Sequence, residues 1–328
     1  ISDWSCFTSV LTNPRCDIVL HSAGEDLVTL LVAFGQLPDV FFDTQIASAY
    51  AGLGFSLSYQ ALVREIIGRE LPKDQTRSDW LKRPLSESQL KYAANDVCYL
   101  LPIYRELSSR LDLRGYLEFL REDAKAQLDS TKLSEQSDFW ELTYTTVSNS
   151  WRLNDNALAC LQRLCVWREV QARKKNLPRS WIAKDAELLV IAQLVREQKK
   201  PTVRDLDNCA AIGSALVRRH GGKLVRLVNQ PPDFSLIDRS LLSPPLSASL
   251  RGLIKGFRQA VQNHAEQMDI SPELLARKKQ LVAVAQKVRR GGDFVWPPEL
   301  KGWRRDRLAA DFREVAGNLN IKGASEHG

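Results

Sequence analysis

Residue types that would mark a zinc protein are scarce in this chain of 328 residues. Its six cysteines are scattered without any Cys-x-x-Cys pair, and its four histidines show no paired spacing. These absences exclude a structural zinc site and indicate a reduced, cytoplasmic protein. No apolar run reaches the roughly 18 residues that a membrane helix needs, so we expect no membrane partner.

A natural start is absent as well. The first residue is Ile1 and the one methionine is Met268, and no charged and then apolar leader opens the chain. We therefore expect a further segment upstream of residue 1. With 44% hydrophobic residues, the chain can bury the cores of two or three domains of ordinary size.

The net charge of +7 is unevenly distributed along the chain. Residues 1–127 carry −4 and residues 128–150 carry −3, whereas residues 151–230 carry +9 and residues 231–328 carry +5. A basic module beside an acidic one suits an enzyme that holds a polyanion in one place and cations in another. The alternative is that the excess of Lys and Arg only solvates a surface.

The first half of the chain alternates between strand and helix patterns. The apolar run Ile18-Val19-Leu20 precedes a helical spacing over Leu27–Phe34, and Val40-Phe41-Phe42 precedes another over Thr44–Ala51. This alternation predicts an α/β domain. A further amphipathic helix is predicted over Leu57–Ile67.

Beyond residue 127 the strand signals nearly vanish. Residues 128–150 look like a linker, and residues 151–230 and 231–328 look like two all-helical domains. The predicted helices are Leu158–Lys175, Asp185–Gln198, Leu216–Val228, Leu246–Gln267 and Pro272–Arg290. A faint internal repeat supports two domains, because residues 181–188 match residues 274–281 at an offset of 93.

A long helix carries the strongest local feature. Ser86 and Gln89 form a capping box that opens a helix running through Leu101 and beyond. Tyr92 and Asp96, one turn apart, lie on the same face. Both faces of the helix look apolar and buried, so the Asp96 carboxylate needs a partner, either a bound cation or a neighbouring helix. The alternative is a partly exposed helix face.

Two further aspartates follow the predicted strands. Asp26 lies near the start of the first helix, and Asp43 lies at the end of the second strand. Acidic residues often occupy such positions because they cap free backbone amides. Each residue alone is therefore equally consistent with a structural role.

Four motifs occur in an order and spacing that closely resemble the ribonuclease D exonuclease domain. They are Gly24-Glu25-Asp26-Leu27, Phe42-Asp43-Thr44-Gln45, Arg77-Ser78-Asp79-Trp80 with Arg83-Pro84-Leu85, and Tyr92-Ala93-Ala94-Asn95-Asp96. The resemblance covers residues 1–127 and points to the tyrosine-containing branch of the DEDD exonucleases. It implies a ribonuclease H-like α/β fold with its N-terminal strands missing, and Asp26, Tyr92 and Asp96 as catalytic residues.

The resemblance also implies a metal site. Two divalent ions, Mg²⁺ or Mn²⁺, would be bound in part by Asp26 and Asp96, since carboxylate oxygens suit such ions. Tyr92 would orient the attacking water. The first motif of the family, Asp-x-Glu on an early strand, has no counterpart here, so we expect it upstream. A polypeptide that really lacks it should be inactive.

The second half of the chain contains the runs Leu164-Cys165-Val166-Trp167-Arg168, Leu177-Pro178-Arg179 and Lys200-Pro201-Thr202. With them the helical domains resemble the helicase and ribonuclease D C-terminal (HRDC) domain, fairly well over residues 151–228 and more loosely over residues 238–320. Basic residues of the first domain would contact RNA phosphates, and we assign this role to Lys174, Lys175, Arg218 and Arg219. In the exonuclease domain, Arg77 and Arg83 either contact phosphate or belong to a salt-bridged structural loop.

These features predict a monomeric 3′–5′ exoribonuclease that releases nucleoside 5′-monophosphates. Its implied substrates are small structured RNAs such as transfer RNA precursors. One alternative is a non-catalytic RNA-binding protein on a decayed or truncated exonuclease scaffold. Another is a related DNA exonuclease, although tandem C-terminal domains without helicase motifs favour RNA.

Overall fold

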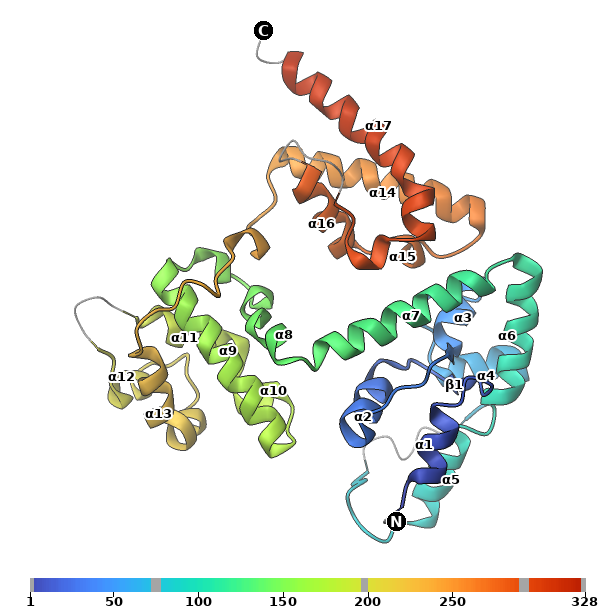
Figure 1. Cartoon of the computed structure of the whole chain (residues 1–328), viewed down its shortest axis with the longest axis horizontal. Helices are drawn as coiled ribbons and strands as arrows, with labels where there is room; N and C mark the ends of the chain where they lie inside the picture. Colours follow the sequence, from blue (N-terminus) through green and yellow to red (C-terminus); the bar gives the residue numbers. More distant parts are fainter. Residues whose placement is uncertain (1–2, 72–77, 196–199, 289–294, 326–328) are drawn as a thin grey trace. The chain divides into compact units, whose positions relative to one another are not determined.

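The computed structural model describes residues 3–71, 78–195, 200–288 and 295–325, and most of them are helical (Figure 1). The chain divides into two compact units. The first comprises Ile1–Thr131 and Leu246–Gly328, and the second comprises Lys132–Pro245. Within the described ranges no helix is long and apolar enough to cross a membrane.

The first unit contains a small parallel sheet where the sequence predicts strands. Strand β1 (Ile18–Leu20) pairs with β2 (Phe41–Asp43) in the register Ile18 to Phe41. Helix α2 (Gly24–Phe34) connects them, and it ends at Gly35, whose left-handed φ of 67° suits glycine. The short helix α1 (Ser5–Leu11) precedes β1. The predicted strand and helix alternation is confirmed.

Five helices follow the sheet. They are α3 (Thr44–Tyr50), α4 (Tyr59–Ile67), α5 (Glu87–Asn95), α6 (Leu100–Arg114) and α7 (Leu117–Ser134). The predicted capping box is confirmed at the start of α5. The Ser86 hydroxyl accepts from the Gln89 amide at 3.2 Å, and the Gln89 side chain accepts from the Ser86 amide at 3.0 Å.

The prediction of one long helix after Ser86 is wrong. Helix α5 ends at Asn95, and α6 begins four residues after Asp96. The Tyr99 amide donates to the Tyr59 hydroxyl at 3.2 Å instead of to a carbonyl of the preceding turn. The Val97 and Leu100 amides donate to carbonyls three residues back, at 3.2 and 3.1 Å, rather than four. A hydroxyl on another helix therefore interrupts the helix that the periodicity predicts.

The predicted burial of both faces is also wrong. Leu90, Val97 and Leu101 are more than half exposed, whereas Ile103 and Leu107 are fully buried. The break after α5 changes the rotation of the second segment, so that α6 turns Ile103 and Leu107 into the core. A single helical wheel across both segments does not describe their faces.

The first unit also contains the C-terminal helices, here called the C-terminal module. They are α14 (Ala248–Met268), α15 (Pro272–Leu275), α16 (Lys278–Val288), the 3₁₀ turn η4 (Pro298–Leu300) and α17 (Trp303–Ser325). One continuous hydrophobic core joins this module to α3, α4, α6 and α7, and its largest side chains include Tyr50, Phe257 and Phe312.

In the described part of the second unit, all regular secondary structure is helical. This unit contains α8 (Ser137–Glu141), η1 (Thr143–Thr146), η2 (Ser150–Arg152), α9 (Asp155–Lys175), α10 (Arg179–Ile182), α11 (Asp185–Gln193), α12 (Val203–Asp207), α13 (Ser214–Val228) and η3 (Arg239–Leu241). The predicted linker, residues 128–150, holds the end of α7 and the turns from α8 to η2. The three predicted boundaries, after residues 127, 150 and 230, stay a prediction.

The internal repeat has a structural counterpart. Helices α9 and α14 both have 21 residues and lie 93 positions apart, as do the starts of α10 and α15 and of α11 and α16. Both long helices end at a left-handed residue, Asn176 with φ 50° and Asp269 with φ 51°. The predicted helix over Pro272–Arg290 is divided into α15 and α16 by the extended Ala276. The two helical groups therefore share one plan.

Candidate functional site

Asp43 is a buried carboxylate whose oxygens all point to backbone amides. One oxygen, Oδ1, accepts from the amide of Gln45 at 2.8 Å and from that of Ser22 at 3.0 Å. The other, Oδ2, accepts from the amide of Ala23 at 2.8 Å. Asp43 thus caps α3 and fixes the turn between β1 and α2, which resolves its ambiguity in favour of a structural role.

Asp26 differs from Asp43 because it is exposed in the first turn of α2. No side chain caps this helix at Ala23, so the structure does not support the capping role for Asp26. Partial burial raises the pKa of the Asp26 carboxyl, and the negative charges of Asp43 and Glu25 raise it further. Burial and negative neighbours therefore disfavour the ionised form of Asp26.

Asp96 lies at the C-terminal end of α5, where its amide donates to the Tyr92 carbonyl at 3.1 Å. Its side chain is exposed rather than buried, and partial desolvation raises the pKa of its carboxyl. Tyr92 is half-buried, with its ring 5.9 Å from that of Trp80. The one-turn spacing predicted for Tyr92 and Asp96 is present.

His21 follows β1 directly and bridges the two strands. Its Nδ1 lies 2.9 Å from the Thr44 hydroxyl, which itself donates to the Leu20 carbonyl at 3.0 Å. The His21 ring and the Thr44 hydroxyl thereby link the ends of β1 and β2. Burial lowers the pKa of His21, while the nearby Asp43 charge opposes that shift. The ring is therefore a neutral bridge at the end of the sheet.

Tyr59 connects this bridge to the motif of Tyr92 and Asp96. Its ring makes an edge contact with His21 at 5.6 Å, and its hydroxyl accepts from the Tyr99 amide at 3.2 Å. Burial raises the pKa of Tyr59 to about 12, and the charge of Asp96 adds to that shift. Contacts and electrostatic interactions therefore run from Asp26 through Asp43, His21 and Tyr59 to Asp96.

The sequence interpretation did not include His21 and Tyr59 in this group. One signal was available for His21, because it ends the first strand as Asp43 ends the second, and the carboxyl ends of parallel strands meet at one edge of a sheet. Tyr59 had no such signal. Its contact with Tyr99 spans 40 residues and depends on how α4 packs.

The loop before α5 is described in part. Arg77 lies outside the described residues. Arg83 is exposed, and its Nη1 donates to the carbonyls of Trp80 at 2.9 Å and Lys82 at 3.0 Å. This arginine supports its own loop. The predicted alternative was a salt-bridged loop, but the bonds of Nη1 go to backbone carbonyls.

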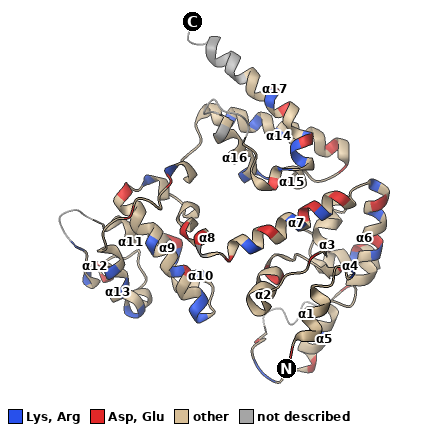
Figure 2. Cartoon of the chain, viewed as in Figure 1, with Lys and Arg blue, Asp and Glu red and all other residues tan. Residues whose placement is uncertain are grey.

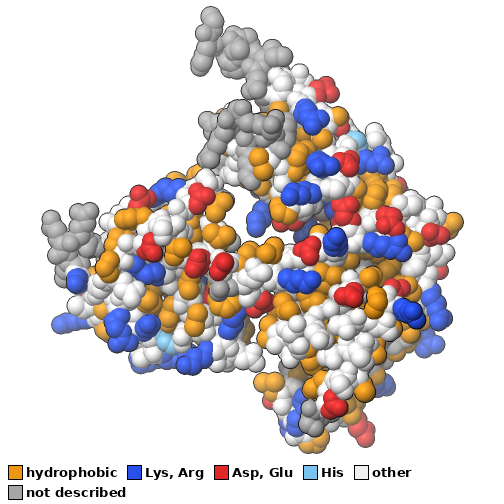
Figure 3. Space-filling model, in the orientation of Figure 1, with side chains coloured by type: hydrophobic (Ala, Val, Ile, Leu, Met, Phe, Trp, Pro, Cys, Tyr) orange, Lys and Arg blue, Asp and Glu red, His pale blue; other side chains and the backbone are white. Residues whose placement is uncertain are grey.

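The basic residues assigned to RNA lie on exposed helix surfaces of the second unit. Lys174 and Lys175 end α9, and Arg218 and Arg219 lie on α13. The Lys175 amine lies 3.4 Å from His220 Nε2. Burial, Lys175 and Arg219 together lower the pKa of His220. The end of α9 therefore lies beside α13, in a region where Lys and Arg gather (Figures 2 and 3).

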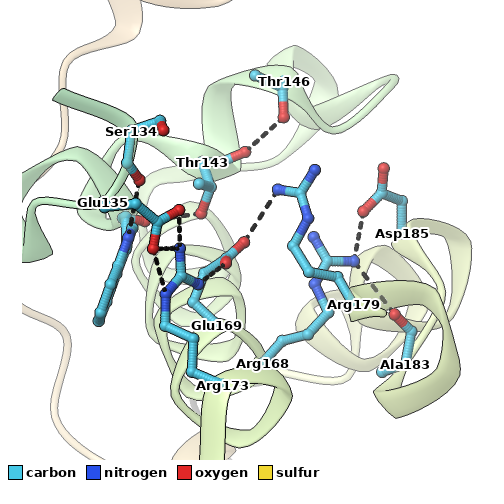
Figure 4. A network of polar contacts seen from close by, with 11 residues as sticks. Ser134, Glu135, Thr143, Thr146, Arg168, Glu169, Arg173, Arg179, Ala183 and Asp185 are labelled. Atoms are coloured by element: carbon cyan, nitrogen blue, oxygen red, sulfur yellow. Dashed lines mark hydrogen bonds and ion pairs between the residues drawn. The ribbon is translucent and has the colours of Figure 1, made fainter. Parts of the chain in front are cut away.

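Arg173 precedes these lysines but has a different role, shown in Figure 4. It pairs with the buried Glu169 at 2.6 Å and with Glu135 at 3.0 Å, and its guanidinium lies 4.0 Å from the Trp140 ring. Arg179 also pairs with Glu169 at 2.9 Å. Arg173 therefore has a structural role, because these partners already engage its guanidinium.

The candidate carboxylates fit a divalent ion in chemistry but form only part of a site. Asp26 and Asp96 offer oxygen ligands, and their raised pKa values indicate charges that a cation would stabilise. Within the described ranges no group of three or more His, Cys, Asp or Glu side chains could hold a metal.

Comparisons with known proteins identify two domain families in the chain. Residues 1–112 match the 3′–5′ exonuclease domain family, and residues 157–228 match the HRDC domain family. The expected fold class, an exonuclease domain followed by HRDC-type helices, is thereby confirmed.

Similar proteins cover almost the whole chain. Ribonuclease D of Pseudomonas paraeruginosa is 37% identical over 309 residues, which are 94% of this chain and 80% of that protein. Ribonuclease D of Escherichia coli is 31% identical over 317 residues, with 94% and 81% covered. The crystal structure of E. coli RNase D, described as an exoribonuclease involved in structured RNA processing, matches with a TM-score of 0.81 at 28% identity. That match covers 97% of this chain and 84% of the other. This chain therefore belongs to the ribonuclease D family of 3′–5′ exoribonucleases.

Proposed function

We propose that this exoribonuclease trims small structured RNAs, transfer RNA precursors among them, with divalent metal ions held in part by Asp26 and Asp96. The supporting observation is the series of contacts and electrostatic interactions that runs from Asp26 through Asp43, His21 and Tyr59 to Asp96. The side chains of Asp26 and Asp96 are exposed, and the pKa of each carboxyl is raised. Mg²⁺ or Mn²⁺ would supply the charge that activates water and stabilises the leaving oxygen.

The roles of the other residues follow from their places. Tyr92, one turn before Asp96, would orient the attacking water through its hydroxyl, and the neutral His21 and Tyr59 would hold the two carboxylate elements together. Lys174, Lys175, Arg218 and Arg219 would contact phosphates, as would Arg77. The exposed Arg83 would do so through nitrogens other than the Nη1 that supports its loop. The six cysteines are free thiols, consistent with a reduced cytoplasmic monomer.

Asp96→Asn in the full-length protein tests the site. We expect release of nucleoside 5′-monophosphates from a precursor with a 3′ extension to fall by at least about 100-fold, because the variant loses a metal-binding charge. Asp112→Asn, at an exposed position on α6, is the matched control and should retain activity. Full activity of Asp96→Asn would remove our site assignment. Competition between matched RNA and DNA 3′ ends would separate an RNA from a DNA exonuclease.

A further inference from the structure

The C-terminal module packs directly on the exonuclease elements of the first unit. The Trp303 ring, at the start of α17, stacks on the Phe119 ring of α7 with centroids 4.4 Å apart and planes within 10°. Trp303 is buried in the hydrophobic core that α3, α6 and α7 share with the module. Such a core is an interface of the folded unit rather than a transient contact.

Arg304 follows Trp303 and reaches into this interface. Its side chain is only 11% exposed, and Nη2 donates to the Asp123 carboxylate at 2.8 Å and to the Tyr50 hydroxyl at 3.4 Å. Nε donates to the Leu274 carbonyl at 2.6 Å. The Tyr50 hydroxyl donates to Asp123 at 2.8 Å. One buried guanidinium thus binds the module and two exonuclease elements together.

Tyr50 is the last residue of α3, and Asp43 caps the opposite end of the same helix. Helix α3 has seven residues, so its ends lie about 10 Å apart, and five of the seven side chains are buried. Through Asp43 the helix binds the amides of Ser22 and Ala23, immediately before α2 presents Asp26. A short, buried helix therefore connects the Arg304 cluster to the turn that positions a candidate metal-binding residue.

We propose that Arg304 is a positioning residue of the nuclease site, which holds α3, and through Asp43 the turn before Asp26, in place. This inference rests on the proposed function of Asp26. It also gives the C-terminal module a role, because the module completes the support of the catalytic elements. A packed helix with both ends fixed can transmit the effect of Arg304 to the turn before Asp26.

Manganese binding to the full-length protein, measured by calorimetry, tests the proposal. Arg304→Met keeps the aliphatic stem and removes the charge. We expect its Kd for Mn²⁺ to rise about tenfold, as for other residues that orient metal ligands. Hydrogen exchange at the amides of Ser22 and Ala23 should accelerate. Arg304→Lys, which can still pair with Asp123, should restore part of the affinity.

Arg114→Met is the matched control. Arg114 anchors the same module by donating to the carbonyls of Met268 and Asp269, at 3.1 and 2.7 Å, and it belongs to α6 rather than α3. We expect this variant to lose stability without losing Mn²⁺ affinity. Equal weakening of Mn²⁺ binding in both variants would overturn the proposal, as would unchanged binding in Arg304→Met.

Tyr50→Phe provides a second test if Arg304→Met does not fold. It removes only the hydroxyl that links α3 to Arg304 and Asp123, and it should weaken Mn²⁺ binding severalfold in the same direction. Unchanged binding in that variant would overturn the inference. Asp26→Asn separates the two proposals. If Asp26→Asn binds Mn²⁺ normally, the proposed metal site is wrong. If Asp26→Asn binds Mn²⁺ weakly and Arg304→Met binds it normally, only the proposed role of Arg304 is wrong.

Discussion

At the scale of single residues, Asp26 and Asp43 illustrate two uses of a carboxylate at the end of a small sheet. Three backbone amides surround the oxygens of Asp43, so its charge is satisfied within the fold. Asp26 meets negative neighbours instead, which raise its pKa. A carboxylate of the first kind stabilises the fold, whereas one of the second kind is available to a cation.

This difference predicts the stability of Asp26→Asn without metal. The pKa of Asp26 is higher in the folded protein than in the unfolded chain. The contribution of this carboxyl to the free energy of unfolding is therefore fully present below the unfolded-state pKa and is lost as the pH rises through the folded-state pKa. The variant should therefore match the unmodified protein near pH 3 and be more stable near pH 7, by up to about 1 kcal/mol since the carboxyl is exposed.

Urea unfolding in the presence of a chelator, across that pH range, measures the effect. Addition of Mn²⁺ should stabilise the unmodified protein but stabilise Asp26→Asn less. Asp43→Asn is the contrasting variant, and it should lose about 1–3 kcal/mol because buried amides lose a charged acceptor. Lower stability of metal-free Asp26→Asn at neutral pH would show that Asp26 supports the fold instead.

At the scale of elements, two interactions distant in sequence decide local structure. The Tyr59 hydroxyl interrupts the helix after Asp96, and this break places Asp96 at the end of α5. In the second unit, Arg173 and Arg179 both pair with Glu169 of α9. Arg173 also pairs with Glu135, in the segment that follows α7. The Arg173 cluster therefore fixes that segment to α9 in the second unit (Figure 4).

Glu169→Gln tests the Arg173 cluster. The side chain is only 3% exposed and accepts from two arginines, so loss of its charge should lower the free energy of unfolding by about 1.5–3 kcal/mol. Asp155→Asn, which breaks an exposed pair with Arg239, is the control and should cost less than about 1 kcal/mol. Equal losses in urea unfolding would mean that burial of Glu169 adds nothing to its ion pairs.

At the scale of the whole molecule, charge separates the parts of the chain. Residues 1–127 carry a net charge of −4 and residues 151–230 carry +9. A polyanion such as RNA is attracted by the second segment, whereas divalent ions are attracted by carboxylates in the first. In the proposed function, RNA binding and metal-dependent hydrolysis would therefore use different segments of the chain.

The double variant Lys174→Gln and Lys175→Gln tests the RNA surface. We expect weaker RNA binding at all sequences and a fall of about one to two in the slope of log affinity against log salt, since two phosphate contacts are lost. Lys125→Gln with Lys132→Gln, at exposed positions on α7, removes the same charge and is the control. An equal fall in both double variants would indicate general attraction rather than contact.

The amino-acid sequence alone predicts the features that depend on neighbouring residues. The order β1, α2, β2, α3 follows from short apolar runs and helical spacing, and the capping box of Ser86 and Gln89 follows from two residues three positions apart. The repeat of the helical domains and the one-turn spacing of Tyr92 and Asp96 are also local patterns. Local patterns persist because propensity, capping and amphipathic spacing act over only a few residues.

Contacts between groups distant in the sequence depend on the packing of the folded chain. This packing brought Tyr59 to the break after α5, engaged Arg173 in ion pairs, surrounded Asp43 with amides, and joined Arg304 to Asp123 across 181 residues. The physical reason is that a polar side chain takes its partner from whatever the packed core places within about 3 Å, and the periodicity of a segment does not specify that partner.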